Sequence, residues 1–312
     1  MILVTGSTGF IGKALVRNLV ESGHSVRMLI RPSPRSPDLP VGVGVEVAVS
    51  SLSDERGLRA AMVGVDTIYH LAGVERRGAY ANLMTVDIAG TLNVVTAAAE
   101  ARIKRIFFTS HLGADRASAY PVLKAKAIAE EHVRLSGIDY TILRSAIVYG
   151  PNDGFTTGLA GLVASVPFFY LTPGDGRTLL QPIWVEDLVT CLVWALDDEK
   201  TKNETYEIGG PEYLMFNQVL ENVMQAIGAE RTIIHTRPPY IRGITVALEA
   251  LFPGLPVSVY WLDYLATNRT CALDTIPRVF HLMPARMTQR LGYLQGVDWQ
   301  RALVRSLLRR RR

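Results

Sequence analysis

The chain opens with MILVTGSTGFIG, residues 1–12, and this stretch decides the fold. A short apolar run is followed by three glycines at three-residue spacing, and residues 13–22 then carry apolar side chains along one helical face. The glycines are Gly6, Gly9 and Gly12. A strand, a glycine turn and a helix in this order bring backbone N–H groups and the positive end of a helix dipole to a pyrophosphate. A glycine triplet alone is weak evidence, but between a strand and a helix it predicts a dinucleotide site.

The composition indicates a protein with a large core. The 312 residues are 48% hydrophobic and 20% charged, which suits roughly two domains. The two cysteines, Cys191 and Cys271, lie far apart in the sequence, so a disulfide scaffold is not indicated and a reducing cytoplasm is expected. The first predicted strand starts at residue 2, leaving no visible signal segment, and no charge-free apolar run is long enough to span a bilayer. The arginines at 309–312 account for the net charge of +4, so a nucleic-acid-binding face is not predicted.

Strand and helix patterns alternate through the first half of the chain. The patterns predict strands at 25–30, 44–48, 67–71, 105–109 and 140–143, and helices at 55–62, 85–101 and 121–136. This alternation predicts an α/β fold, a doubly wound parallel sheet with helices on both faces. We expect a nucleotide-binding core at 1–150 and a smaller C-terminal substrate-side portion at 151–312, of which about 180–210 returns to the core. The Pro-rich loop 31–42 is expected to be mobile.

Several motifs stand at characteristic places along the chain: TGSTGFIG, SSLSD, YHLAG, Tyr-x-x-x-Lys at 120–124, DYTILRSAIVYGP and WVEDL. They resemble those of the atypical and extended short-chain dehydrogenases/reductases. This superfamily includes epimerase/dehydratase-like and NmrA-like proteins and the nucleotide-binding accessory subunit of respiratory complex I. The resemblance covers about residues 1–230 and implies a Rossmann core that binds NAD(P). It implies cofactor contacts from Gly6, Ser7, Thr8, Gly9, Phe10, Ile11, Gly12, Ser51, Leu52, Leu71, Ala72, Gly73, Thr109 and Val148.

Two positions depart from that family pattern. Ser51 stands where the family usually has an aspartate near the adenine, and Asp87 stands where extended members often have asparagine. We expect Asp87 to be a solvated helix residue. His70 lies within a predicted strand and is expected to pack in the core, and no Cys/His cluster with metal-binding spacing occurs in the sequence.

The end of the second predicted strand bears on the choice of cofactor. NAD-binding proteins usually place an acid there for the ribose 2′-hydroxyl, whereas this chain has Arg27 and Arg31 and no acid. A guanidinium matches a 2′-phosphate in charge and geometry. We therefore predict NADP rather than NAD, with a solvated loop arginine at 31 as the alternative.

The catalytic residues can be assigned in two registers. In the first, the resemblance implies Tyr120 as the acid/base, Lys124 as the lysine that activates it and binds the nicotinamide ribose, and Ser110 as the polarising hydroxyl. Helical spacing places residues i and i+4 on one face, and a nearby cation favours the phenolate.

In the second register, KAIAEEHVRLSG aligns Lys126 with the family lysine and puts Val122 in the place of the tyrosine. Pro121 favours the first position of a helix, which would leave Tyr120 at the helix entrance. The protein would then bind NADP but lack this proton donor.

The segment 241–265 is apolar and aromatic, but Arg242, Glu249, Pro253, Gly254 and Pro256 argue against a membrane span. It is typical of a cap over an apolar pocket, and a lipid- or quinone-facing surface or a contact with a partner protein is the alternative. The terminal arginines could reach anionic headgroups at the cytoplasmic face of a membrane or remain solvated.

Two functions follow from the sequence. The first is an NADP-dependent oxidoreductase or epimerase/dehydratase-like enzyme acting on a small, partly apolar or quinone-like substrate. The second is a catalytically silent NADP-binding accessory subunit, assembly factor or sensor. The residues do not name the substrate, because substrate contacts in such folds lie in variable loops.

Overall fold

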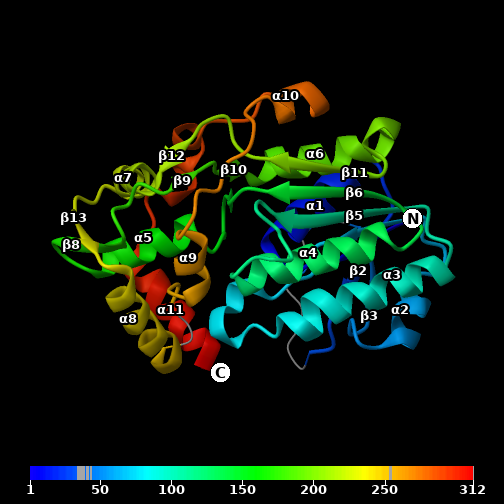
Figure 1. The fold of residues 1–312 in the computed structure, drawn as a ribbon, viewed down its shortest axis with the longest axis horizontal. Coiled ribbons are helices and arrows are strands. Elements are labelled where there is room, and N and C mark those ends of the chain that lie inside the picture. The colour runs from blue at the N-terminus through cyan, green and yellow to red at the C-terminus, as the bar shows by residue number, and fades with distance from the viewer. Residues whose placement is uncertain (34–38, 40–41, 43, 253–254, 312) are drawn as a thin grey trace.

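The computed structural model describes residues 1–33, 39, 42, 44–252 and 255–311, and Figure 1 shows how they are arranged. Most of the loop 31–42 and the side chains of Arg309–Arg312 therefore lie outside the described residues. The mobility predicted for that loop falls on these residues and stays a prediction. Within the described part of the chain, no helix is both long and apolar enough to cross a membrane.

A parallel sheet forms the centre of the molecule, with strand order β11-β6-β5-β4-β1-β2-β3. Its strands are β1 (Ile2–Thr5), β2 (Val26–Ile30), β3 (Glu46–Val49), β4 (Thr67–His70), β5 (Arg105–His111), β6 (Asp139–Ser145) and β11 (Glu204–Ile208). The predicted doubly wound α/β fold is thereby confirmed. The third strand begins two residues later than predicted, at Glu46, where pairing with Arg27 of β2 starts.

Helices cover both faces of the sheet because successive strand residues point to opposite sides. Tyr69 and Phe107 pack with α1 (Phe10–Glu21) and α6 (Val185–Asp197) on one face. Ile68, Ile106 and Phe108 pack on the other face with α2 (Glu55–Ala61), α3 (Gly90–Glu100) and α4 (Pro121–Arg134), and α3 and α4 lie in front of the sheet in Figure 1. A π-helical segment, Met84–Ala89, precedes α3 where the sequence predicts one continuous helix.

The C-terminal elements gather beside one end of the sheet, at the left of Figure 1. The helices there are α5 (Thr156–Ser165), α7 (Phe216–Ile227), α8 (Pro238–Leu251), α9 (Val259–Tyr264) and α11 (Trp299–Arg311), and α10 (Thr275–Phe280) packs beside α6 and β11. Small strand pairs join β7 (Val148–Tyr149) with β10 (Ile183–Trp184), β9 (Leu179–Leu180) with β12 (Leu214–Met215), and β8 (Phe169–Pro173) with β13 (Thr232–Thr236). The four 3-10 segments of the described chain are Glu75–Tyr80, Glu199–Thr201, Met287–Gln289 and Leu291–Leu294. Because α6 and β11 pack on the central sheet, residues after 180 return to it.

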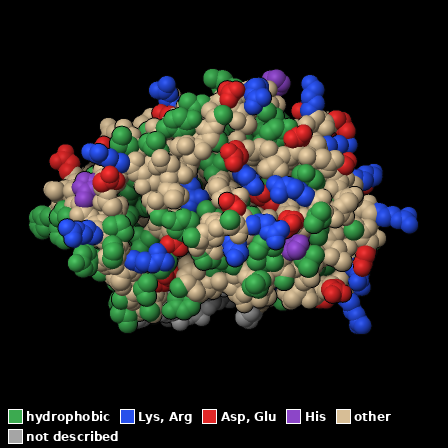
Figure 2. All heavy atoms as spheres, in the orientation of Figure 1, with side chains coloured by type: hydrophobic (Ala, Val, Ile, Leu, Met, Phe, Trp, Pro, Cys, Tyr) green, Lys and Arg blue, Asp and Glu red, His purple; other side chains and the backbone are tan. Residues whose placement is uncertain are grey.

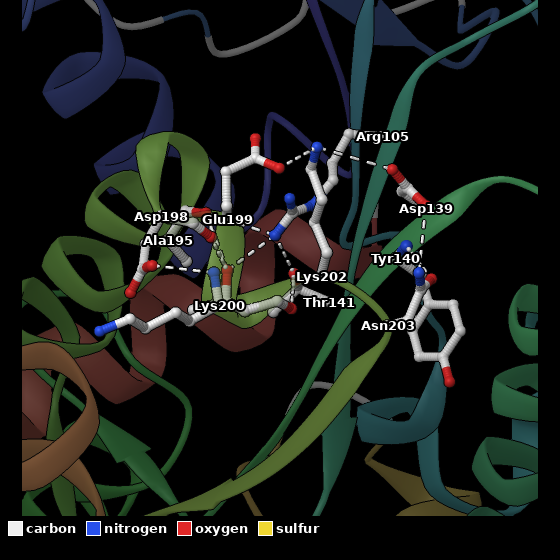
Figure 3. Close-up of polar contacts among 11 residues, drawn as sticks. Arg105, Asp139, Tyr140, Thr141, Ala195, Asp198, Glu199, Lys200, Lys202 and Asn203 are labelled. Carbon is white, nitrogen blue, oxygen red and sulfur yellow. Dashed lines mark hydrogen bonds and ion pairs between the residues drawn. The ribbon is translucent and has the colours of Figure 1, made fainter.

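A buried arginine fastens this returning segment to the sheet (Figure 3). The Arg105 guanidinium donates hydrogen bonds to the hydroxyls of Thr141 and Thr201, each at 2.7 Å, and lies 5.0 Å from the centre of the Phe107 ring. Nearby, Asn203 donates to the Asp139 carboxylate and accepts from the Tyr140 N–H. These contacts hold the start of β11 against β6.

We expect Arg105→Ala to lower the free energy of unfolding by about 3 kcal/mol, because it removes two charge-assisted hydrogen bonds and leaves a cavity. Urea denaturation measures the change. Lys104→Ala is the matched control, since the exposed Lys104 ion pair with Asp66 should contribute within about 1 kcal/mol. Equal effects of the two substitutions would contradict the role assigned to Arg105.

Candidate cofactor and active site

A groove of about 310 Å³ runs along the carboxyl ends of β1, β2 and β4. The lining residues that were predicted from the sequence are Gly6, Thr8, Gly9, Arg31, Ser51, Leu52, Leu71, Ala72 and Gly73. The lining residues that were not predicted are Thr5, Leu29, Ser50, Ser53, Val74, Thr85 and Val86. Thr5 and Leu29 could have been inferred, because they stand at or next to the ends of strands that meet at this edge. Thr85 and Val86 come from the π-helical segment, for which the sequence gives no signal.

The glycine turn leaves no room for side chains. Gly6 has φ +68°, and a Cβ on it would lie 2.7 Å from the Leu71 carbonyl carbon, while a Cβ on Gly12 would lie 2.2 Å from the Gly6 oxygen. Helix α1 begins after Gly9 and has no acidic residue in its first turn. The turn therefore places the positive dipole end of α1 at the groove, which fits a diphosphate.

Arg27 and Arg31 differ in their surroundings. Arg27 pairs with Glu46 at 2.7 Å and donates to the carbonyls of Ala61 and Val63, so it stabilises the edge of the sheet. Arg31 is exposed and lines the groove next to Ser51. Of the two, Arg31 is placed to meet a ligand.

A buried ion pair lies beyond the groove. The Lys126 ammonium is 3.0 Å from the Asp87 carboxylate, and their side chains are only 5% and 1% exposed. The other Asp87 oxygen accepts a hydrogen bond from the N–H of Val74, a groove residue, at 3.2 Å. Our expectation that Asp87 is solvated is wrong, because the π-helical turn carries it inward onto Lys126.

Comparisons with known proteins agree with this geometry. The pattern of the NAD(P)H-binding family matches residues 6–161. The chain belongs to this family, among the atypical short-chain dehydrogenases/reductases. This confirms the resemblance seen in the sequence and the presence of an NAD(P)-binding Rossmann core.

Relatives of this short-chain dehydrogenase/reductase include enzymes and a respiratory subunit. It is 33% identical over 225 residues to NADH dehydrogenase [ubiquinone] 1 alpha subcomplex subunit 9 of Arabidopsis thaliana, covering 70% of this chain and 56% of that protein. It is 31% identical over 316 residues to the ceramide reductase of Caulobacter vibrioides, covering 97% of this chain and 95% of that protein. The triphenylmethane reductase structure from Citrobacter sp. superposes with a TM-score of 0.74 over 93% of this chain and 97% of that one, at 19% identity, and so shows the same fold.

His70 is a packed core residue of the Rossmann fold, as expected. Its two ring nitrogens lie 2.7 Å from the Thr5 hydroxyl and 3.0 Å from the Thr91 hydroxyl. Burial, with a smaller effect from the Lys126 charge, lowers the pKa of His70 to about 3. The ring is therefore neutral at physiological pH and adds no second positive charge beside Lys126.

The residues of the first catalytic register lie near the end of β5 and at the start of α4. Tyr120 is the N-cap of α4, with its ring 6.0 Å from the Arg269 guanidinium, and Lys124 is exposed. Ser110 is buried, and its hydroxyl has no hydrogen-bond partner among the described residues. Burial raises the pKa of the Glu130 carboxyl, but the hydrogen bonds from Arg144 outweigh this and leave that pKa lowered. Lys124 is absent from the groove lining, and its predicted contact with a cofactor stays a prediction.

The residues of the second register lie in the first two turns of α4. Lys126 is buried, and Val122 packs against the C-terminal apolar cluster. Arg144 forms hydrogen bonds of 2.9 and 2.8 Å with Glu130 and so joins β6 to α4.

The remaining predicted cofactor residues lie outside the groove lining. Ser7 is buried and donates to the Leu29 carbonyl at 3.4 Å. Gly12 packs against the glycine turn, and Phe10 lies beside Gly150. Ile11, Thr109 and Val148 are at least partly buried and are also absent from the groove. Their predicted contacts with a cofactor stay predictions.

We expect Lys126→Met to weaken NADPH binding about tenfold or more, because a charged hydrogen-bond donor is lost. Lys124→Met, two residues away and exposed, should leave the Kd unchanged. Fluorescence titration with NADPH measures both values. Lys126→Met leaves Asp87 as an uncompensated buried charge, so the double variant K126M/D87N is measured alongside. Normal NADPH affinity in the folded double variant would contradict a role of Lys126 in binding the cofactor.

Proposed function

We propose that the protein is an NADP(H)-dependent oxidoreductase that reduces a carbonyl group on an apolar, lipid-like substrate. The observation that carries the proposal is an apolar cavity of about 240 Å³ beneath α8 and α9. Its lining includes Phe155, Leu159, Tyr170, Ile241, Leu248 and Trp261. The near full-length relation to a ceramide reductase supports the same substrate class.

The cavity and the cofactor groove share a connecting segment. Val74 lines the groove, and four residues later a Cβ on Gly78 would lie 3.0 Å from the Cβ of Ser258, which lines the cavity. Glu249 of α8 accepts hydrogen bonds from the N–H groups of Ala79 and Val259. A substrate tail in the cavity would thus be held close to the nicotinamide end of the groove.

The chain's own residues supply binding and protons. Lys126, held by Asp87, would bind the ribose hydroxyls, and the glycine turn would bind the diphosphate. NADPH when bound supplies the hydride that adds to the carbonyl carbon, and a proton on the carbonyl oxygen completes the alcohol. Tyr120 and His111, which line one small cavity at the end of β5, are the groups we assign as sources of that proton.

If the cavity holds the substrate tail, we expect kcat/KM to rise about fourfold for each added methylene until the cavity is filled, because each buried methylene contributes about 0.8 kcal/mol. The measurement is NADPH oxidation with 3-oxo esters of increasing chain length and with quinones. Ile241→Trp should remove the preference for long chains, whereas Val246→Trp, on the exposed side of α8, should preserve it. Turnover independent of chain length would contradict the proposal.

One observation favours a second function. In the second register, Val122 stands at the position where active family members have their tyrosine. In that case the protein is a catalytically silent NADP-binding accessory subunit or assembly factor. The same assay separates the two functions. Tight NADPH binding without oxidation of NADPH by any carbonyl or quinone would favour the silent protein.

We propose NADPH over NADH because of Arg31. Arg31→Ala should weaken NADPH binding about tenfold and leave NADH binding unchanged, since only NADPH carries the 2′-phosphate. Titration with both cofactors measures this. Arg56→Ala removes an exposed arginine outside the groove lining and serves as the control. An equal loss for NADH and NADPH on removal of Arg31 would show that it does not select the phosphate.

A further inference from the structure

Helix α8 is apolar on both sides. Ile241 and Leu248 face the cavity, while Tyr240, Val246 and Leu251 are 68%, 49% and 66% exposed. Its exposed residues after Arg242 are all uncharged: Gly243, Ile244, Val246, Ala247, Ala250 and Leu251. A helix on a water-facing surface normally carries polar side chains on its outer face. The outer face of α8 therefore requires a non-aqueous neighbour.

The loop before β8 adds a second apolar element. Phe168 is 81% exposed and has φ +75°, a conformation that bulky residues rarely adopt. The Phe169 N–H donates to the Pro167 carbonyl and the Thr232 N–H donates to the Phe168 carbonyl, so a γ-turn holds the ring outward. Folding gains little from this exposed ring, which points to a role outside the fold.

These elements form one surface, the apolar edge, made by residues 166–173 and 232–252. Figure 2 shows hydrophobic side chains gathered at the left and lower left, where Figure 1 has β8, β13 and α8. The exposed charged side chains of these two segments are Arg237 and Arg242, because Glu249 is buried. Arg242 forms an ion pair with Asp263 at 2.6 Å, so Arg237 supplies the positive charge of the edge. The edge is therefore apolar with a positive charge, which complements an anionic lipid surface and not a second copy of itself.

The cavity beneath α8 opens on the same edge. Val166, Phe169, Leu171 and Ile244 are each at least 36% exposed and also line the cavity. An apolar mouth of this kind is wetted poorly by water and is continuous with a lipid phase when a membrane covers it.

We propose that the apolar edge docks on an anionic lipid bilayer, with Phe168 and Leu251 at the boundary of headgroups and acyl chains and Arg237 at the lipid phosphates. Docking places the cavity mouth against the bilayer. The inference rests on the surface alone and holds whether or not the protein is a reductase.

The test is co-sedimentation of the full chain with vesicles of phosphatidylcholine alone and of phosphatidylcholine mixed in equal parts with phosphatidylglycerol. We expect tighter binding to the mixed vesicles. The variant F168N/L251Q should bind both roughly a hundredfold more weakly, and Asn tolerates the φ of residue 168. Arg237→Gln should weaken binding about fivefold on the mixed vesicles and leave binding to phosphatidylcholine unchanged.

The matched control is V63Q/L135Q, which removes two apolar side chains of similar exposure, 70% and 77%, from the Rossmann core. Binding that is absent, that the control weakens equally, or that F168N/L251Q leaves intact would overturn the proposal. Sedimentation velocity without lipid gives a further check: a dimer that F168N/L251Q converts to monomer would show that the edge is a subunit interface. The affinity of each variant for NADPH is measured to show that the variant is folded. This measurement does not depend on reductase activity.

Discussion

The buried pair of Lys126 and Asp87 is the interaction on which the arrangement of the site depends. It joins α4 to the turn before α3, and through the Val74 N–H it fixes the loop that leaves β4 beside the groove. Removing one partner of such a pair leaves an uncompensated charge and costs roughly 3–5 kcal/mol, so neither residue can change alone without large effect. Neutral His70 beneath the pair adds no competing charge.

The glycine turn and the sheet were predictable because their signals are local. Gly6 and Gly12 must lack a Cβ wherever a turn packs this closely, and alternating strand and helix patterns define a parallel sheet. The choice between Lys124 and Lys126 was less accessible, since a spacing of four residues fits two registers until the first residue of the helix is known. Pro121 was the signal that favoured the register with Lys126. The burial of Asp87 depends on a π-helical turn, which a sequence pattern does not reveal.

The cap and the core are coupled through one carboxylate. Glu249 is buried and accepts hydrogen bonds from Ala79, on the loop that follows the groove, and from Val259, at the start of α9. The φ of +57° at Gly78 lets the backbone pass this carboxylate, because a Cβ there would lie 1.9 Å from a Glu249 oxygen. Glu249 therefore ties α8 to the segment that follows the groove and to the start of α9.

The apolar character of α8 on both sides follows from its position. One side lines an apolar cavity, and the apolar residues of the outer side gain burial only when that side is also covered. In water the exposed Tyr240 and Leu251 contribute no burial energy, whereas against lipid each contributes favourably. The cavity lining, the cavity mouth and the outer face of α8 thus share one physical requirement, an apolar environment on the C-terminal side of a polar cofactor groove.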